Sequence, residues 1–294
     1  MKVLMVGATG QFAHMVVPEL KRRNVTVRAL VRDEVRAATA RRQGSDETVI
    51  GDLGDPVSLR KAAEGVDGVF SLTPAFAPDE SQMGMAMVEA ARAGGVKKFV
   101  FQSVMHPSLM ALVNHTSKLP VEGAIYDSGM DYTVFQPAMF MQNLKGAWPR
   151  VVDNGILAMP YSKTAKACYV DYRDVAEAIA LALTDVTLSY GTFELCAPGM
   201  VNRVQLAAMM SAALGRDVEA GEIDPAQWAR GLPDTPMGRG LAHMMVHYDE
   251  HGLPGGNSVV LRTVLGRDPR TLEEYVGELA SQESRTVVGA KTTR

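Results

Sequence analysis

The chain has 294 residues, of which 47% are hydrophobic and 21% charged, with a formal net charge of −3. These values are typical of a soluble globular protein and exclude a general attraction to nucleic acid or to an anionic membrane. No apolar run reaches the roughly 18 residues that a membrane-spanning helix needs. The first strand pattern begins where a signal sequence would lie, and the two cysteines, Cys168 and Cys196, are typical of thiols in a reducing compartment. The sequence therefore predicts a cytoplasmic protein.

The N-terminal segment predicts the phosphate-binding turn of a dinucleotide fold. Residues 2–6 form an apolar run, and Gly7-Ala8-Thr9-Gly10-Gln11-Phe12-Ala13 separates this run from a helical pattern. In such a unit Gly7 permits the tight turn, and Gly10 lets the backbone approach a pyrophosphate at the start of the helix. A small residue at Ala13 permits close packing of helix on strand. We expect cofactor contacts from Gly7, Thr9, Gly10, Gln11 and Phe12.

The second predicted strand, residues 26–31, ends at Arg32. A dinucleotide fold that prefers NAD usually places Asp or Glu near this point, where it holds the ribose 2′-hydroxyl. A guanidinium suits a 2′-phosphate instead, because its charge and its planar fork of donors match that group. Arg32 thus favours NADP(H). NAD(H) stays open because Asp33 follows directly, and a solvated surface charge is the alternative interpretation of Arg32.

Strand and helix patterns alternate through the first half of the chain. Residues 49–53 are predicted as a strand and its exit, further strands are predicted at 68–72 and 98–102, and helices are predicted to start at Asp55-Pro56 and to cover 79–93. This alternation predicts a parallel sheet with right-handed crossovers, in which loops at the carboxyl ends of the strands line the ligand crevice. The residues expected to contact the cofactor there are Asp52, Leu53, Leu72, Thr73 and Pro74.

Several motifs follow the fifth predicted strand. They are Phe99-Val100-Phe101-Gln102-Ser103, Asn114-His115-Thr116-Ser117-Lys118, Glu122, Ser128-Gly129-Met130-Asp131-Tyr132, Gln136-Pro137 and Phe140-Met141-Gln142-Asn143. Together they resemble the NmrA-like branch of the atypical short-chain dehydrogenase/reductases, and within that branch the chain is similar to the type 2 NADPH:quinone oxidoreductases. Later motifs, such as Leu265-Gly266-Arg267-Asp268-Pro269, extend the resemblance over nearly the whole chain.

The resemblance implies an α/β fold, namely a Rossmann doubly wound parallel sheet with a smaller, discontinuous C-terminal substrate lobe. The Rossmann domain would contain residues 1–137 plus about 166–198, and the lobe residues 138–165 plus 199–282. Residues 283–294, rich in Ser, Thr, Lys and Gly, predict a flexible tail. Further cofactor contacts are implied for Ser103, Lys118, Pro137 and Phe140. Substrate contacts are implied for Phe76, His106, Phe140, Asn143 and Tyr161.

The chemistry of this chain departs from the usual pattern of the wider superfamily. Typical members use Tyr-x-x-x-Lys, in which the lysine binds the nicotinamide ribose and the tyrosine protonates the reduced carbonyl. None of the eight tyrosines here is followed by Lys four positions later. The resemblance aligns Lys118 with that lysine and Asn114 with the tyrosine. A carboxamide cannot act as a general acid at neutral pH, although it can donate a hydrogen bond to a carbonyl oxygen.

His115 is the leading candidate for the proton donor, because an imidazole titrates near neutrality. One step along a helix rotates a side chain by about 100°, so the alternative is a partly exposed histidine that points away from the nicotinamide. Ser103, His106, Tyr161 and bound water are further candidates. A quinone or another conjugated acceptor lowers the demand for a donor, because solvent can protonate the stabilised product. We therefore expect such an acceptor rather than a simple ketone.

Two functions of different class remain. The first is an NADPH-dependent reductase, monomeric or homodimeric, that transfers hydride to a small apolar carbonyl, enone or quinone and has no nucleic-acid or membrane partner. The second is an NAD(P)-sensing regulator with little or no catalysis, which the missing tyrosine favours because the NmrA-like group includes such members. A sugar-nucleotide epimerase or dehydratase ranks third, since its mechanism ordinarily requires the missing Tyr-Lys pair.

The histidines His243, His247 and His251 recur every fourth residue, which would put them on one face of a helix. The segment has no His-Glu-x-x-His motif and no accompanying cysteine, and Gly252 and Pro254 end the helical pattern nearby. The sequence therefore predicts no metal site, and a helix bordering the substrate cleft is the preferred interpretation.

Overall fold

The computed structural model describes residues 1–292, with side chains described for residues 1–283. The chain divides into two compact units. The first, which we call the sheet unit, comprises Met1–Pro137, Tyr172–Leu195 and Thr263–Gly266. The second unit comprises Ala138–Asp171, Cys196–Arg262 and Arg267–Arg294.

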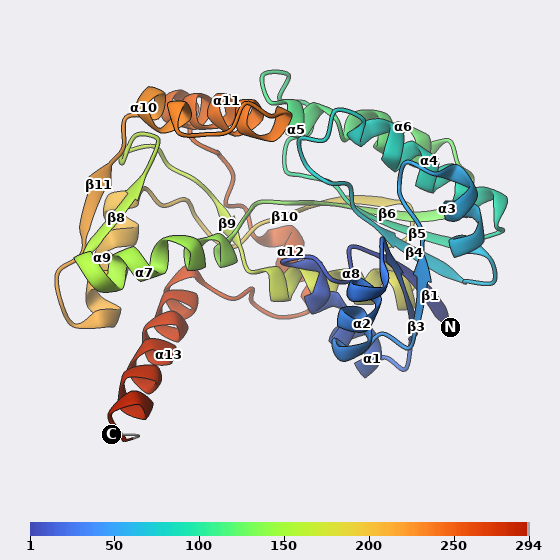
Figure 1. Ribbon diagram of the computed structural model, residues 1–294, viewed down its shortest axis with the longest axis horizontal. Coiled ribbons are helices and arrows are strands. Elements are labelled where there is room, and N and C mark those ends of the chain that lie inside the picture. The colour runs from blue at the N-terminus through green and yellow to red at the C-terminus, as the bar shows by residue number, and fades with distance from the viewer. Residues whose placement is uncertain (293–294) are drawn as a thin grey trace. The chain divides into compact units, whose positions relative to one another are not determined.

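The sheet unit contains a seven-stranded parallel sheet with the strand order β10-β6-β5-β4-β1-β2-β3 (Figure 1). The order runs outward in both directions from the neighbours β1 and β4, which confirms the predicted doubly wound Rossmann sheet. The strands are β1 (Lys2–Val6), β2 (Thr26–Val31), β3 (Glu47–Ile50), β4 (Gly68–Ser71), β5 (Lys98–Gln102), β6 (Asp131–Pro137) and β10 (Gly191–Leu195).

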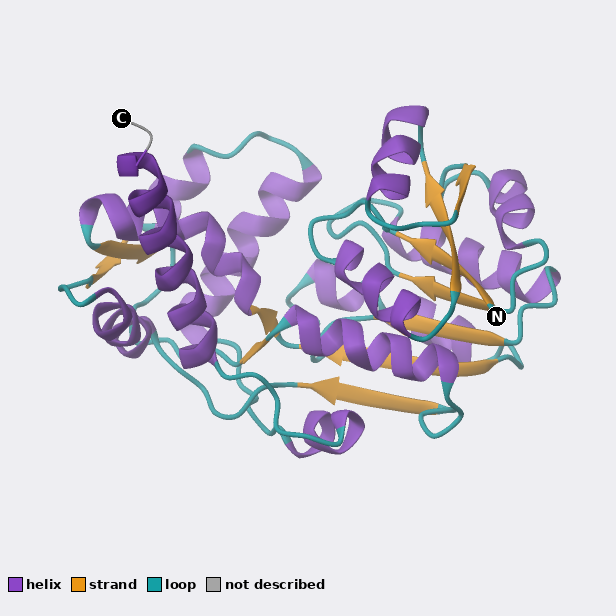
Figure 2. Cartoon of the chain, turned by 90° about the horizontal axis from the view of Figure 1, so that it is seen from below, coloured by secondary structure: helices purple, strands orange, loops and turns teal. Residues whose placement is uncertain are grey.

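Helices pack on both faces of this sheet (Figure 2). They are α1 (Val16–Arg22, preceded by the 3₁₀ turn Ala13–Met15), α2 (Glu34–Arg42), α3 (Pro56–Ala63), α4 (Glu80–Ala93), α5 (Val113–Thr116), α6 (Leu119–Tyr126) and α8 (Tyr172–Thr184). The helix start expected at Asp55-Pro56 is confirmed, because the Asp55 side chain accepts a hydrogen bond from the Val57 amide at 3.0 Å and Pro56 is the first helical residue.

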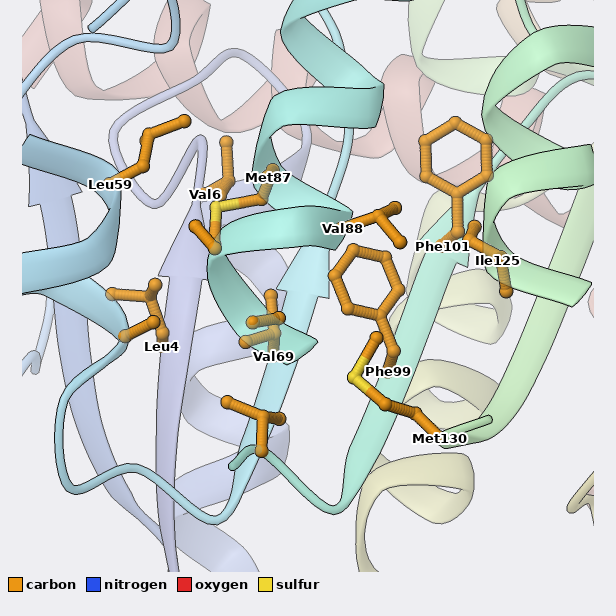
Figure 3. Close-up of a cluster of buried hydrophobic side chains, with 14 of the residues drawn as sticks. Leu4, Val6, Leu59, Val69, Met87, Val88, Phe99, Phe101, Ile125 and Met130 are labelled. Carbon is orange, nitrogen blue, oxygen red and sulfur yellow. The ribbon is translucent and has the colours of Figure 1, made fainter. Parts of the chain in front are cut away.

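One face of the sheet is buried under α3, α4 and α6, which pack side by side along it. Alternate strand residues such as Leu4 and Val6, or Phe99 and Phe101, point to this face and belong to one buried cluster with Met87 of α4 (Figure 3). The intervening residues are buried on the opposite face. Burial on both faces explains why the strands were recognisable as continuous apolar runs.

The fourth strand ends at Ser71 rather than at the predicted Leu72, and the third ends at Ile50. The residues that follow each strand leave the ladder and line a pocket at the carboxyl edge of the sheet. The apolar character of Leu72 therefore reflects the lining of that pocket, which a strand pattern does not distinguish from core.

The second unit has two small parallel sheets, β7 (Met139–Phe140) with β9 (Tyr169–Val170) and β8 (Ile156–Met159) with β11 (Glu219–Glu222). Its helices are the 3₁₀ turn Met141–Asn143, α7 (Leu144–Asn154), α9 (Arg203–Leu214), α10 (Pro225–Arg230), α11 (Pro236–His251) and α13 (Leu272–Thr292), while α12 (Val259–Leu265) contains residues of both units. The predicted tail, residues 283–294, includes the last turns of α13 and residues 293 and 294, which lie outside the described residues. No described helix has the length and hydropathy needed to cross a bilayer.

Candidate functional site

The turn between β1 and α1 has the backbone geometry that a phosphate group requires. Gly7 has φ +77°, a left-handed conformation that favours glycine, and the Gly10 amide donates to its carbonyl at 2.8 Å. A Cβ on Gly10 would lie 3.0 Å from that same carbonyl oxygen, and a Cβ on Gly7 would lie 3.2 Å from Leu72 Cδ2. No side chain caps the helix start at Phe12. The turn is therefore a tight backbone cradle in which larger residues would displace their neighbours.

A pocket of about 310 Å³ lies beside this turn, at the carboxyl ends of β1, β2 and β4. Eight of the residues predicted as cofactor contacts line it, namely Gly7, Thr9, Gly10, Arg32, Asp52, Leu53, Leu72 and Pro74. Gly51 belongs to the wall, where a Cβ would lie 2.9 Å from Ser58 Oγ and 3.0 Å from Leu30 Cδ1. The pocket thus extends along the edge of the sheet from the glycine turn to the end of β2, where these predicted cofactor contacts lie.

Sequence reasoning missed several pocket residues. They are Val6, Leu30, Val31, Arg36, Gly51 and Met83. Arg36 could have been found, because it follows Arg32 by four residues and lies in the first turn of α2. Nothing in the sequence indicated that Met83, in the first turn of α4, lines the pocket, because a methionine on a helix is more often part of the core.

The end of β2 presents positive charge to the pocket. The side chains of Arg32 and Arg36 are exposed and both line the pocket. The Asp33 carboxylate caps α2 and pairs with Arg36. Its Oδ1 accepts a hydrogen bond from the Arg36 amide at 2.7 Å, and its Oδ2 lies 3.6 Å from Arg36 Nε. Guanidinium groups in this place can hold an anion in bidentate fashion.

Lys118 lies next to the pocket and is nearly fully buried. Its ammonium donates to Thr73 Oγ1 at 2.6 Å and to Glu80 Oε1. Thr73 lies between Leu72 and Pro74, which line the pocket, but Lys118 itself is not among the lining residues. Burial lowers the pKa of Lys118, and the opposing effect of the Glu80 carboxylate raises it. Glu80, the first residue of α4, is a partner of Lys118 that the sequence did not indicate.

Ser103, at the end of β5, belongs to a second buried cluster. Its hydroxyl donates to Glu122 Oε1 at 2.5 Å. The same carboxylate accepts from Gln136 Nε2 at 3.1 Å and from the Tyr126 hydroxyl at 3.2 Å. Glu122 thus ties α6 to the carboxyl ends of β5 and β6. It contributed to the family resemblance, but nothing in the sequence indicated this role.

His115 is buried, with only 1% of its surface exposed, so the alternative of a partly exposed surface histidine is wrong. Its Nδ1 lies 3.1 Å from the His106 carbonyl oxygen, which can only accept, so Nδ1 carries a proton. Asn114 precedes it on the one-turn helix α5 and is partly buried. His106 has φ +54°, and its Nε2 lies 3.4 Å from Glu194 Oε2. The tertiary fold, rather than the helical spacing, decides how His115 is oriented.

The remaining predicted residues lie outside the pocket lining. Gln11 is exposed, the Phe12 ring lies 5.6 Å from that of Tyr172, and Pro137 is buried at the end of β6. Phe76, in the loop after β4, has φ +65°. Three further residues belong to the second unit, where Phe140 is in β7, Asn143 is exposed and the Tyr161 ring is stacked under the Arg203 guanidinium, 4.6 Å from its centroid. Their contacts with a substrate stay predictions.

The histidines of α11 form no metal cluster with other ligands. The rings of His247 and His251 lie 4.8 Å apart, and burial together with the neighbouring histidines lowers the pKa of His247. In the part of the chain that the structure describes, no three His, Cys, Asp or Glu side chains are grouped so that they could hold a metal ion.

Known proteins resemble the chain over nearly its full length. An NAD(P)H azoreductase of Xenophilus azovorans is 32% identical over 277 residues, which cover 93% of this chain and 96% of that protein. Quinone oxidoreductase 2 of Escherichia coli is 26% identical over 284 residues, covering 94% and 98%. The crystal structure of an NADPH-dependent quinone oxidoreductase of Escherichia coli, complexed with NADPH, superposes with a TM-score of 0.82 at 25% identity, covering 94% of this chain and 99% of that one. The model of the NmrA-like family matches residues 1–276, and the chain belongs to that family.

Proposed function

We propose that this protein is an NADPH-dependent reductase that transfers hydride to a small apolar acceptor, a quinone, an enone or another conjugated carbonyl. The observation that carries the proposal is the pocket that joins the Gly7–Gly10 turn to the guanidinium groups of Arg32 and Arg36. A pyrophosphate fits the glycine turn, and a 2′-phosphate fits the two arginines. The similarity to an NAD(P)H azoreductase and to quinone oxidoreductases supports the same conclusion.

The residues present fit a bound dinucleotide. A Cβ at Gly7 would crowd Leu72 and a Cβ at Gly10 would crowd the Gly7 carbonyl, so glycine at both positions keeps the turn tight enough for a phosphate to approach its backbone amides. Adenine would lie against Leu53, which lines the pocket together with Gly51. When NADPH is bound, its nicotinamide supplies the hydride. NAD(H) would lack the group that Arg32 and Arg36 are suited to bind, and we infer a preference for NADP(H).

The chain's own residues would orient the reactants rather than form covalent bonds with them. We assign Lys118 to the nicotinamide ribose, Ser103 and Asn114 to hydrogen bonds near the acceptor, and His115 to proton delivery. Because Nδ1 of His115 is bonded to the His106 carbonyl, Nε2 is the nitrogen from which a proton would be transferred. The substrate contacts assigned to Phe76, His106, Phe140, Asn143 and Tyr161 are part of this proposal, as is a monomer or homodimer.

The acceptor class follows from the missing tyrosine. A simple ketone needs a strong general acid as hydride arrives, whereas a conjugated acceptor spreads the developing charge and solvent can protonate it. The names of the two relatives, an azoreductase and a quinone oxidoreductase, refer to acceptors of this conjugated kind. We therefore expect quinones and azo compounds to be reduced faster than isolated ketones.

The first experiment is NADPH oxidation, followed by its absorbance, across a panel of quinones, azo dyes, enones, aldehydes and ketones. Calorimetric titration of NADPH and NADH with the same protein accompanies it. We expect tighter binding of NADPH than of NADH and turnover with at least one conjugated acceptor. Absence of NADPH binding would contradict the proposed function.

A second candidate function is an NAD(P)-sensing regulator. The observation in its favour is that no tyrosine of the chain precedes a lysine by four positions. The same panel separates the two functions, since tight NADPH binding without turnover in any acceptor class supports the regulator. The search would then move from substrates to protein partners.

A further inference from the structure

The carboxylate of Glu80 is the centre of a buried cluster that we call the Glu80 clamp, formed by Thr73, Phe76, Glu80 and Lys118. Glu80 is 1% exposed, and its Oε1 accepts from the Lys118 ammonium and, at 2.8 Å, from the Thr73 hydroxyl. Its Oε2 accepts from the Phe76 amide at 3.1 Å. One carboxylate therefore binds both the lysine and the loop that runs from β4 to α4.

The loop that the clamp holds is part of the pocket wall. Leu72 and Pro74, on either side of Thr73, line the pocket, and Met83 lines it from the first turn of α4. Phe76 has φ +65°, a conformation that a phenylalanine adopts only under constraint, and its amide is bonded to Glu80. Without the carboxylate the loop would lose the contact that holds this strained residue.

The packing of α4 against α6 brings Glu80 and Lys118 together. A Cβ on Gly84 of α4 would lie 2.4 Å from Val121 Cγ2 of α6. The two helices therefore approach so closely that residue 84 has no room for a side chain. Ser81 Oγ also donates to the Ser117 carbonyl at 2.7 Å, one residue before Lys118. The position of the lysine is thus set by the helix that carries Glu80.

We propose that Glu80 is a positioning residue for the cofactor, acting through Lys118. The ammonium of Lys118 has three N–H donors, of which two are directed to Thr73 and Glu80 in the described residues. The proposal assigns the third to a ribose hydroxyl of NADPH. This inference rests on the proposed function, in which NADPH is the ligand.

Charge is the second part of the role of Glu80. Burial alone favours a neutral lysine, and the neighbouring carboxylate opposes this by raising the Lys118 pKa. Thr73 is neutral, the His115 ring is bonded to the His106 carbonyl, and no other described charged group shifts the Lys118 pKa. Replacing the carboxylate by an amide therefore lowers the pH above which Lys118 loses its charge.

The test uses Glu80→Gln, Lys118→Met and the double variant, with Glu34→Gln as the matched control. Glu34 is also the first residue of a helix but is exposed and makes no contact with the pocket. The binding of NADPH and of 2′,5′-ADP is measured by calorimetry at about pH 7 and about pH 9, because burial lowers the Lys118 pKa and so moves the loss of its charge to lower pH than for an exposed lysine. The fragment 2′,5′-ADP has the groups that Arg32 and Arg36 would bind but lacks the nicotinamide ribose.

We expect Glu80→Gln to weaken NADPH binding about tenfold near neutral pH, which corresponds to about 1.4 kcal/mol of lost interaction. At the higher pH the loss of affinity should be larger. Binding of 2′,5′-ADP should change less than about twofold. The double variant should bind NADPH about as weakly as Lys118→Met alone, because the two residues act as one unit. A purely structural role of Glu80 would weaken both ligands equally and leave the pH dependence of wild type.

Two results would overturn the inference. One is Glu80→Gln with the NADPH affinity and pH dependence of wild type, and the other is equal loss of NADPH and 2′,5′-ADP binding. Wild-type protein that binds neither ligand would instead contradict the proposed function, so the two failures are distinguishable. Thermal unfolding of each variant shows whether it is folded, and Thr73→Val supplies a milder variant of the same cluster if Glu80→Gln does not fold.

Discussion

Single side chains at the end of β2 decide which charge the pocket presents. Asp33 is the acidic residue that left NAD(H) open in the sequence, but the structure uses its carboxylate to cap α2 and to pair with Arg36. Arg32 and Arg36 both remain in the pocket wall. The proposed preference for NADP(H) therefore depends on the hydrogen bond that the Asp33 side chain accepts from the Arg36 amide as much as on Arg32.

Arg32→Glu should weaken NADPH binding by roughly 10–100-fold and NADH binding by far less, because only NADPH has a 2′-phosphate for the guanidinium to bind. Calorimetric titration of both nucleotides measures the difference. Arg42→Glu, the same charge change at the end of α2 and outside the pocket, is the control. Equal losses for the two nucleotides would remove Arg32 from the 2′-phosphate site.

His115→Gln tests the proton donor. A glutamine amide can still donate to the His106 carbonyl, which avoids leaving that buried acceptor unsatisfied at a cost of about 1–3 kcal/mol. A histidine that donates a proton must be protonated, so turnover should fall as pH rises through its pKa, and this decline should be absent in the variant. The pH–rate profile is measured beside that of His251→Gln, an exposed histidine. Identical profiles of His115→Gln and wild type would exclude His115.

At the scale of elements, two buried carboxylates connect helices to the carboxyl edge of the sheet. Glu80 connects α4 with the loop after β4, and Glu122 connects α6 with β5 and β6. Both helices also pack against each other at Gly84 and Val121. The positions of Lys118 and Ser103 thus depend on how closely α4 and α6 approach.

Gly84→Ala should destabilise the protein by ~1–3 kcal/mol, because the added methyl group would overlap Val121 and force the helices apart. Denaturant unfolding measures this loss. Gly123→Ala is a matched control on α6, since no atom lies within 4 Å of its added Cβ. In that variant helix propensity alone acts, and we expect a gain of ~0.5–1 kcal/mol. Similar stability of the two variants would contradict the close packing at Gly84.

At the scale of the whole molecule, NADPH should stabilise the native state against heat. A ligand that binds only the folded chain adds about 2.7 kcal/mol when its concentration is 100 times its Kd. The unfolding temperature should therefore rise with NADPH and less with NADH at equal concentration, and Arg32→Glu should abolish the difference. Thermal scans across a range of both nucleotides measure it. An unchanged unfolding temperature in saturating NADPH would contradict specific binding.

The strands of the parallel sheet and most of the pocket could be predicted from the sequence, because both depend on local signals. Strands buried on both faces read as apolar runs, and a tight turn after the first strand requires glycine at Gly7 and Gly10. The end of each parallel strand lies at one edge, so Arg32, Asp52 and Leu72 were expected together and are found in one pocket. The end of the fourth strand was placed one residue too late because Leu72, which lines the pocket, is also apolar.

The clusters around Glu80 and Glu122 could not be predicted, because their members are far apart in the chain. Glu80 meets Lys118 across 38 residues, and Glu122 meets Ser103 across 19. A charged residue at a helix start reads as exposed in any sequence pattern, and for His115 the helical spacing left a partly exposed position open as the alternative. The sequence by itself determined the fold class, the phosphate turn and the basic residue after the second strand. Only tertiary packing decided which polar side chains are buried together, since that depends on contacts between helices that no local pattern encodes.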